Sequence, residues 1–122
     1  LPPDLMSLCV DTGHCIYAGM DPCDVLTTYQ DRVKYLHFKD INPDVHKVSV
    51  ANGVDFYKAI GNNIFCPLGE GCVDFEKVKQ TLIEIDFKGW VTVEQDTDPS
   101  AKSDAKTDAE RSRMFIEQTI LS

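Results

Sequence analysis

Three short apolar runs in the sequence have the pattern of buried β-strands, and each ends in polar side chains. Leu8-Cys9-Val10 precedes Asp11, a β-rich run covers residues 33–40, and a β-branched run covers residues 90–94. Continuous apolar strands favour a parallel sheet that helices cover. Because parallel strands deliver their carboxyl ends to one rim, we expect the polar ends of the three runs to lie together.

Helical patterns alternate with these strands. After a loop that follows the first strand, Asp21-Pro22 predicts a helix start, with apolar residues at 25, 26 and 29 on one face. Asp74 predicts the cap of a second helix, whose apolar stripe falls at 75, 78, 82 and 85. Between them, residues 41–71 are punctuated by glycines and read as an elaborated loop with helical fragments around 43–52 and 54–60.

A terminal helix is expected after a polar, lysine- and aspartate-rich segment. Thr107 and Glu110 have capping-box spacing, and Ala109, Ile116 and Ile120 form the predicted apolar face. The repeated strand and helix units predict the α/β class. With 122 residues, the chain is too short for an eight-unit barrel of about 250 residues. Since it also begins without methionine, we expect a partial chain.

Composition narrows the possible partners. Twenty acidic residues outweigh twelve scattered basic ones, giving a formal net charge of -8, which argues against nucleic acid. No run of about 18 apolar residues predicts a membrane span. The five cysteines include no C-x-x-C pair, which argues against a structural zinc module. Their odd number favours reduced thiols, as in a cytoplasmic protein.

Asp11, His37 and Glu94 are the candidate metal ligands, because the three strands present them at corresponding ends. Taken singly, an aspartate at a strand end is typically a cap or turn residue, and a lone histidine a core or rim residue. Together they form a hard oxygen and nitrogen set suited to Mn²⁺, Co²⁺, Mg²⁺, Fe²⁺ or Zn²⁺. The set is one ligand short, and no other residue is an obvious fourth.

Four segments, in order, resemble the xylose isomerase-like barrel superfamily of sugar isomerases and epimerases. They are Asp-Thr-Gly-His at 11–14, Tyr-Leu-His-Phe-Lys-Asp at 35–40, Pro-Leu-Gly-Glu-Gly-Cys-Val-Asp-Phe at 67–75 and Gly-Trp-Val-Thr-Val-Glu-Gln-Asp at 89–96. Within it, the Gly-Met-Asp-Pro turn at 19–22 and the Glu-Gln-Asp ending at 94–96 are most similar to the inosose dehydratases. The resemblance covers roughly residues 7–118.

The resemblance implies that residues 1–122 form one partial domain, the last three βα units of a (β/α)8 TIM barrel, on strands 6 to 8. Asp11, His37 and Glu94 fall where the family places metal ligands, Mn²⁺ or Co²⁺ being the first expectation. A fourth ligand, a glutamate of the fifth strand, lies upstream of residue 1. His14 falls where the epimerases contact a substrate hydroxyl, and Lys39 is a candidate for stabilising an enediolate or another substrate oxygen.

The chemistry implied is abstraction of a proton next to a carbonyl in a small sugar or inositol derivative, with Glu94 as a base. An inosose dehydratase-like lyase and a ketose isomerase or epimerase both remain open. A non-catalytic partial barrel is a third hypothesis, and its open strand edge makes a homo-oligomer possible. An endonuclease IV-like hydrolase is the weakest alternative, since Asp44-Val45-His46 lies far before Gly69-Glu70-Gly71 and the surface is acidic.

Overall fold

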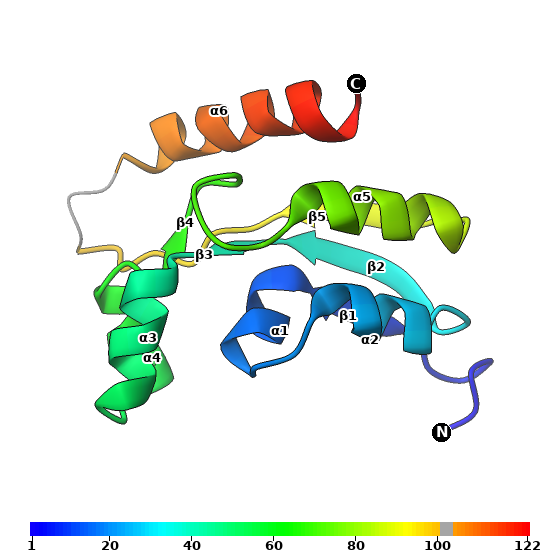
Figure 1. Ribbon diagram of the computed structural model, residues 1–122, viewed down its shortest axis with the longest axis horizontal. Helices are drawn as coiled ribbons and strands as arrows, with labels where there is room; N and C mark the ends of the chain where they lie inside the picture. The colour runs from blue at the N-terminus through cyan, green and yellow to red at the C-terminus, as the bar shows by residue number, and fades with distance from the viewer. Residues whose placement is uncertain (101–103) are drawn as a thin grey trace.

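The computed structural model describes residues 1–100 and 104–122, and a three-stranded parallel sheet lies at its centre (Figure 1). The strands stand in the order β1 (Leu8–Asp11), β2 (Val33–Phe38) and β5 (Trp90–Val93). Asp11 is in register with His37, and His37 with Thr92. The α/β class and the parallel sheet predicted from the apolar runs are therefore confirmed.

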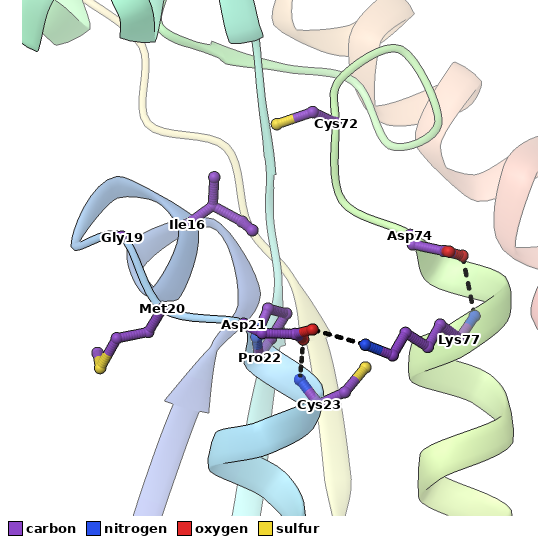
Figure 2. A pocket seen from close by; sticks show the side chains of 9 residues that line it. All are labelled: Ile16, Gly19, Met20, Asp21, Pro22, Cys23, Cys72, Asp74 and Lys77. Atoms are coloured by element: carbon purple, nitrogen blue, oxygen red, sulfur yellow. Dashed lines mark hydrogen bonds and ion pairs between the residues drawn. The ribbon is translucent and has the colours of Figure 1, made fainter.

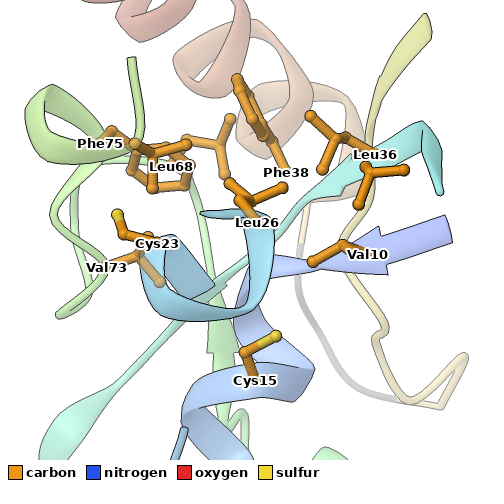
Figure 3. Packing of buried hydrophobic residues seen from close by; sticks show 11 residues of the cluster. Val10, Cys15, Cys23, Leu26, Leu36, Phe38, Leu68, Val73 and Phe75 are labelled. Atoms are coloured by element: carbon orange, nitrogen blue, oxygen red, sulfur yellow. The ribbon is translucent and has the colours of Figure 1, made fainter. Parts of the chain in front are cut away.

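One face of this sheet packs against helices and forms the main core. α2 (Pro22–Thr28), α5 (Phe75–Glu84) and the terminal helix α6 (Ala105–Phe115), continued as η1 (Ile116–Ile120), contribute to it. Leu26 of α2 and Leu36 and Phe38 of β2 meet in its middle, and Phe75 of α5 closes one side (Figure 3). The helix starts predicted at 21–22 and 74 are confirmed, because Asp21 and Asp74 cap α2 and α5.

The opposite face of the sheet carries no helix in the described part of the chain. Alternation along the strands directs Cys9, Tyr35 and Trp90 to this face. Trp90 is 78% exposed, although an indole of this size is normally half covered or more. A groove of about 660 Å³ also follows the free edge of β1 and reaches Asp11. In the partial barrel that the sequence resemblance implies, the remaining units would cover both surfaces.

The segment directly after β1 corrects one expectation. We expected a loop there, but α1 (Thr12–Tyr17) begins immediately after Asp11, whose carboxylate accepts a hydrogen bond from the His14 amide and so caps the helix. A six-residue helix holding one glycine has little helical signal of its own. Its position depends on contacts with distant residues, described below.

The elaborated loop between β2 and α5 is a small substructure with its own core. β3 (Asp40–Ile41) pairs antiparallel with β4 (Phe65–Cys66), and α3 (Pro43–Ala51) and α4 (Phe56–Gly61) lie between them. The two helical fragments are confirmed. The β3–β4 pair was missed, since two-residue strands have no readable periodicity.

The terminal helix begins earlier than the capping-box spacing predicts. Asp104 is the cap: its Oδ1 accepts a hydrogen bond from the Thr107 amide, and Thr107 lies inside the helix. Ala109 is exposed, contrary to the expected apolar face, whereas Ser112 is buried. Ile116 and Ile120 pack against the core as expected. Part of the polar segment before this helix, residues 101–103, lies outside the described residues.

In the described part of the chain, no helix has the length and apolar character needed to cross a bilayer.

Candidate metal centre

Asp11, His37 and Glu94 converge at the carboxyl end of the sheet. One ligand atom from each lies within 4.8 Å of the others. His37 Nδ1 is 2.7 Å from Glu94 Oε2 and 3.5 Å from Asp11 Oδ2. The register explains this, because Asp11 and His37 are paired and Glu94 lies two residues beyond Thr92, the other partner of His37, on the same face. The predicted convergence is observed.

Asp11 carries the clearest sign that this cluster binds a cation. The side chain is only 9% exposed, and Oδ1 is occupied by the His14 amide at 2.9 Å. Oδ2 is buried and has no hydrogen-bond partner among the described residues. A buried carboxylate oxygen without a hydrogen bond is costly unless a cation lies beside it, and in this structure the Lys39 ammonium faces it at 3.2 Å. The hard donor set, and a buried carboxylate oxygen that accepts no hydrogen bond, both fit a divalent metal ion.

Lys39 is the fourth member of the cluster, and it is almost completely buried. Its Nζ donates a hydrogen bond to Asp96 Oδ2 at 2.8 Å and lies 3.1 Å from Glu94 Oε2 and 3.2 Å from Asp11 Oδ2. Burial lowers the pKa of this ammonium, but the hydrogen bonds and charges of the three carboxylates outweigh burial and raise the pKa above its ordinary value. Lys39 therefore stays charged.

Two residues at the start of α1 place Lys39. The Thr12 hydroxyl donates to the Lys39 carbonyl at 2.7 Å and accepts from the Lys39 amide at 2.9 Å. A methyl group on Gly13 would come within 2.8 Å of Lys39 Cγ, so only glycine leaves room for the lysine stem. These contacts fix α1 over the end of β2 and explain why a helix forms at a locally weak sequence.

His14 and Asp96 lie at the mouth of the cluster. His14 Nε2 is 3.2 Å from Lys39 Nζ and 3.9 Å from Asp96 Oδ2, and its ring contacts those of Phe56 and Phe65. This position agrees with a substrate contact for His14, which stays a prediction. Asp96 was missed as a site residue. Its signal is the two-residue spacing from Glu94, which places both carboxylates on one side of an extended segment.

Asp40 was also missed, and it holds the loop beside the site. The carboxylate is fully buried. Oδ2 accepts from the amides of Gly69 and Gly71 at 2.9 and 3.0 Å, and Oδ1 from those of Val73 and Ile41 at 3.0 and 2.9 Å. Asp40 is thus a structural anchor and not a member of the metal cluster.

Glu70 stands at the tip of this loop. The loop turns tightly, since the Glu70 amide donates to the Pro67 carbonyl at 3.1 Å. Its carboxylate pairs with Arg111 of α6. From the sequence alone, Gly69-Glu70-Gly71 predicts a tight turn that exposes the Glu70 side chain, with closure over a substrate as the alternative. In the structure the carboxylate joins the loop to α6.

His46 does not join the cluster. Its Nε2 lies 3.2 Å from the Tyr17 carbonyl, and its ring packs on that of Tyr17. Among the described residues, the only group of three or more potential ligands that meet is Asp11, His37 and Glu94. The Asp44-Val45-His46 segment therefore does not supply the ligand pair that an endonuclease IV-like site needs.

A second hollow, of about 490 Å³, lies between the start of α2 and the start of α5 (Figure 2). Its charged groups are occupied with each other: Lys77 donates to Asp21 at 2.6 Å, and that hydrogen bond lowers the pKa of Asp21. None of the three clustered ligands lines this hollow. It does not belong to the candidate centre.

Comparison with known proteins assigns the family. Residues 1–119 match the family model described as xylose isomerase-like TIM barrel. The chain belongs to this family. Its parallel sheet with helices on one face is part of such a barrel.

Curated relatives include an inosose dehydratase of Geobacillus kaustophilus, 37% identical over 118 residues, and one of Bacillus cereus, 36% identical over 116 residues. These alignments cover 97% and 95% of the present chain. They cover only 38% and 39% of the relatives. The chain thus spans well under half the length of the proteins it resembles.

Solved structures agree on the fold. A sugar phosphate isomerase/epimerase from Parabacteroides distasonis superposes with a TM-score of 0.65 at 19% identity, over 95% of this chain and 32% of that one. A probable 3-DHS dehydratase from Bacillus anthracis gives a TM-score of 0.61 at 20% identity, over 92% of this chain and 38% of that one. Isomerases and dehydratases therefore share this arrangement of strands and helices.

Proposed function

We propose that this chain forms the carboxyl-terminal part, strands 6 to 8, of a metal-dependent lyase that dehydrates an inosose or a closely related polyol ketone. The observation that carries the proposal is the convergence of Asp11, His37 and Glu94 around a buried carboxylate oxygen, Asp11 Oδ2, that accepts no hydrogen bond. The curated relatives support the dehydratase reaction, since they are inosose dehydratases at up to 37% identity over nearly the whole chain.

Asp11, His37 and Glu94 would hold the divalent metal, with Mn²⁺ or Co²⁺ as the first candidates. When bound, such an ion supplies Lewis-acid polarisation of a carbonyl and makes the neighbouring C–H more acidic. A further glutamate ligand on a preceding strand is part of this proposal, as the family resemblance implies. We therefore expect residues 1–122 by themselves to bind the metal weakly and to turn over poorly.

Glu94 is the proposed base. Its carboxylate lies at the carboxyl end of the parallel sheet, the rim at which barrel enzymes bind their substrates, and is 39% exposed in this chain. Taking the proton next to the carbonyl leaves negative charge on the substrate oxygen. Lys39, 3.1 Å from Glu94 Oε2, supplies a fixed positive charge beside that position. His14, at the mouth, is placed to hydrogen-bond a substrate hydroxyl.

The same proton abstraction begins dehydration, isomerisation and epimerisation. In the dehydration, the electron pair left on carbon forms the double bond and expels the hydroxyl of the adjacent carbon, which leaves as water with the abstracted proton. In an isomerase or epimerase, a proton returns instead. The product distinguishes the two: an unsaturated ketone with loss of water supports the lyase, whereas an isomeric sugar supports the alternative.

The test follows exchange of solvent deuterium into the carbon next to the carbonyl of an inosose, using the protein that carries this chain. Glu94→Gln is nearly isosteric but cannot accept the proton, so we expect exchange to fall by about 10²-fold or more. Glu84→Gln, an exposed change on α5, is the matched control and should exchange at the wild-type rate. Unchanged exchange in Glu94→Gln would refute the role of Glu94.

A further inference from the structure

The ammonium of Lys39 forms ion pairs with two of the carboxylate oxygens that would bind the proposed metal ion. Its Nζ is 3.2 Å from Asp11 Oδ2 and 3.1 Å from Glu94 Oε2. His37 Nδ1 faces the same two oxygens, at 3.5 and 2.7 Å. A divalent cation held by Asp11, His37 and Glu94 must therefore share these oxygens with Lys39 or displace it from them.

Lys39 has little freedom to withdraw into solvent. The side chain is 1% exposed, its stem runs close past Gly13, and its Nζ lies 4.9 Å from the centroid of the Phe65 ring. Asp96 Oδ2, at 2.8 Å, is the shortest of its ion-pair contacts, and Asp96 is the only described residue outside the proposed ligands whose carboxylate pairs with it. A small movement toward Asp96 is thus the available way to free the ligand oxygens.

We propose that Lys39 and Asp96 together set the affinity of this site for a divalent cation. Lys39 is the resident counter-ion of Asp11 and Glu94, and Asp96 is a positioning residue that retains the ammonium when a divalent cation takes those oxygens. The inference rests on the proposed metal site. The charges agree with it: three carboxylates and one ammonium leave two net negative charges, which one divalent cation neutralises.

The opposite signs of two substitutions test this exchange. Lys39→Met keeps the apolar stem but removes the competing charge, so Mn²⁺ should bind about tenfold more tightly. Asp96→Asn removes the alternative partner and leaves Lys39 on the ligand oxygens, so Mn²⁺ should bind about tenfold more weakly. If Lys39 and Asp96 only stabilised the local structure, both substitutions would weaken Mn²⁺ binding.

The experiment measures Mn²⁺ affinity by titration calorimetry on the protein that carries this chain, as the wild type, Lys39→Met, Asp96→Asn and the double variant. In the Lys39→Met background, Asp96 has no ammonium to retain, so Asp96→Asn should change affinity by under about threefold. Lys88→Met and Asp86→Asn make the same charge changes in an exposed ion pair before β5 and should leave affinity unchanged.

The results separate this inference from the metal site itself. Tighter binding in Lys39→Met, together with a loss of the Asp96 effect in the double variant, supports the exchange. If the wild type binds Mn²⁺ and Lys39→Met binds it equally or more weakly, the exchange is overturned and the metal site stands. An undiminished Asp96 effect without Lys39 overturns the positioning role. If the wild type and all the variants fold but none of them binds Mn²⁺, the metal site and the exchange are overturned together. Asp96 is 35% exposed, so its variant is expected to fold.

Discussion

Replacing Asp40 by asparagine should destabilise the fold far more than any other isosteric change of an aspartate in this chain. The Asp40 carboxylate is fully buried and accepts four backbone N–H groups, two at each oxygen. An amide has one oxygen, so two of the four donors would face an NH₂ group. Hydrogen bonds to a charged group contribute about 1.5–3 kcal/mol each, and the expected loss from two of them is therefore about 3–6 kcal/mol.

The damage should spread from the loop to the terminal helix. The loop that Asp40 anchors also carries Leu68, whose amide donates to Ser112 of α6 at 3.1 Å, and Gly69, which packs against Phe115. We therefore expect the amides of Gly69 and the α6 helix to lose hydrogen-exchange protection in Asp40→Asn. The hydrogen-exchange protection of the β1 and β2 amides should fall only by the amount that the loss of global stability accounts for.

Urea unfolding followed by circular dichroism measures the loss, with Asp74→Asn as the matched control. Asp74 accepts a single amide hydrogen bond, from Lys77 at an exposed helix start, where asparagine caps equally well. The control should stay within about 0.5 kcal/mol of the wild type. An Asp40→Asn variant as stable as the control would refute the assignment of Asp40 as the anchor of the loop.

Three further outcomes are expected. Burial, together with the charge of Asp40, raises the pKa of the Cys66 thiol from 9.0 to about 12. A disulfide reagent at pH 8 should therefore modify Cys66 roughly 40-fold more slowly in the folded chain than in the urea-unfolded chain. Peptide mass spectrometry measures both rates. Since the thiol of the unfolded chain ionises at lower pH than that of the folded chain, the stability present below pH 9.0 should fall as pH rises toward about 12. Over the same pH range, the urea midpoint of Cys66→Ser should fall less than that of the wild type. Gly13→Ala forces the Lys39 stem aside and should cost about 1–3 kcal/mol in urea unfolding, whereas Gly61→Ala, at the end of α4 with its nearest neighbour 3.6 Å away, should cost nothing or stabilise by up to about 1 kcal/mol.

The parts of the fold that were predictable from sequence are those with local signals. Asp21-Pro22 and Asp74 mark helix starts by their own chemistry, and the structure has helices that begin there. The α1 helix and the β3–β4 pair have no such signal, because they are stabilised by distant groups such as Thr12 with Lys39. Likewise, the start of α6 depends on which of several polar residues caps it.

The candidate site divides in the same way. The meeting of Asp11, His37 and Glu94 follows from parallel strands, which place their ends on one rim. The sequence does not show that Lys39 is buried among three carboxylates, since its contact with Asp96 joins residues 57 positions apart. Nor does it show that Asp40, one residue after Lys39, turns away to anchor a loop. Such roles depend on how the elements pack.

Pulsed electron paramagnetic resonance of bound Mn²⁺ tests the central claim most directly. If Asp11, His37 and Glu94 hold the ion, its spectrum should show coupling to an imidazole nitrogen. The coupling should vanish in His37→Gln and persist in His46→Gln, which changes a histidine that packs on Tyr17 instead. Coupling that persists in His37→Gln, or Mn²⁺ bound with no nitrogen coupling in the wild type, would contradict the proposed metal centre.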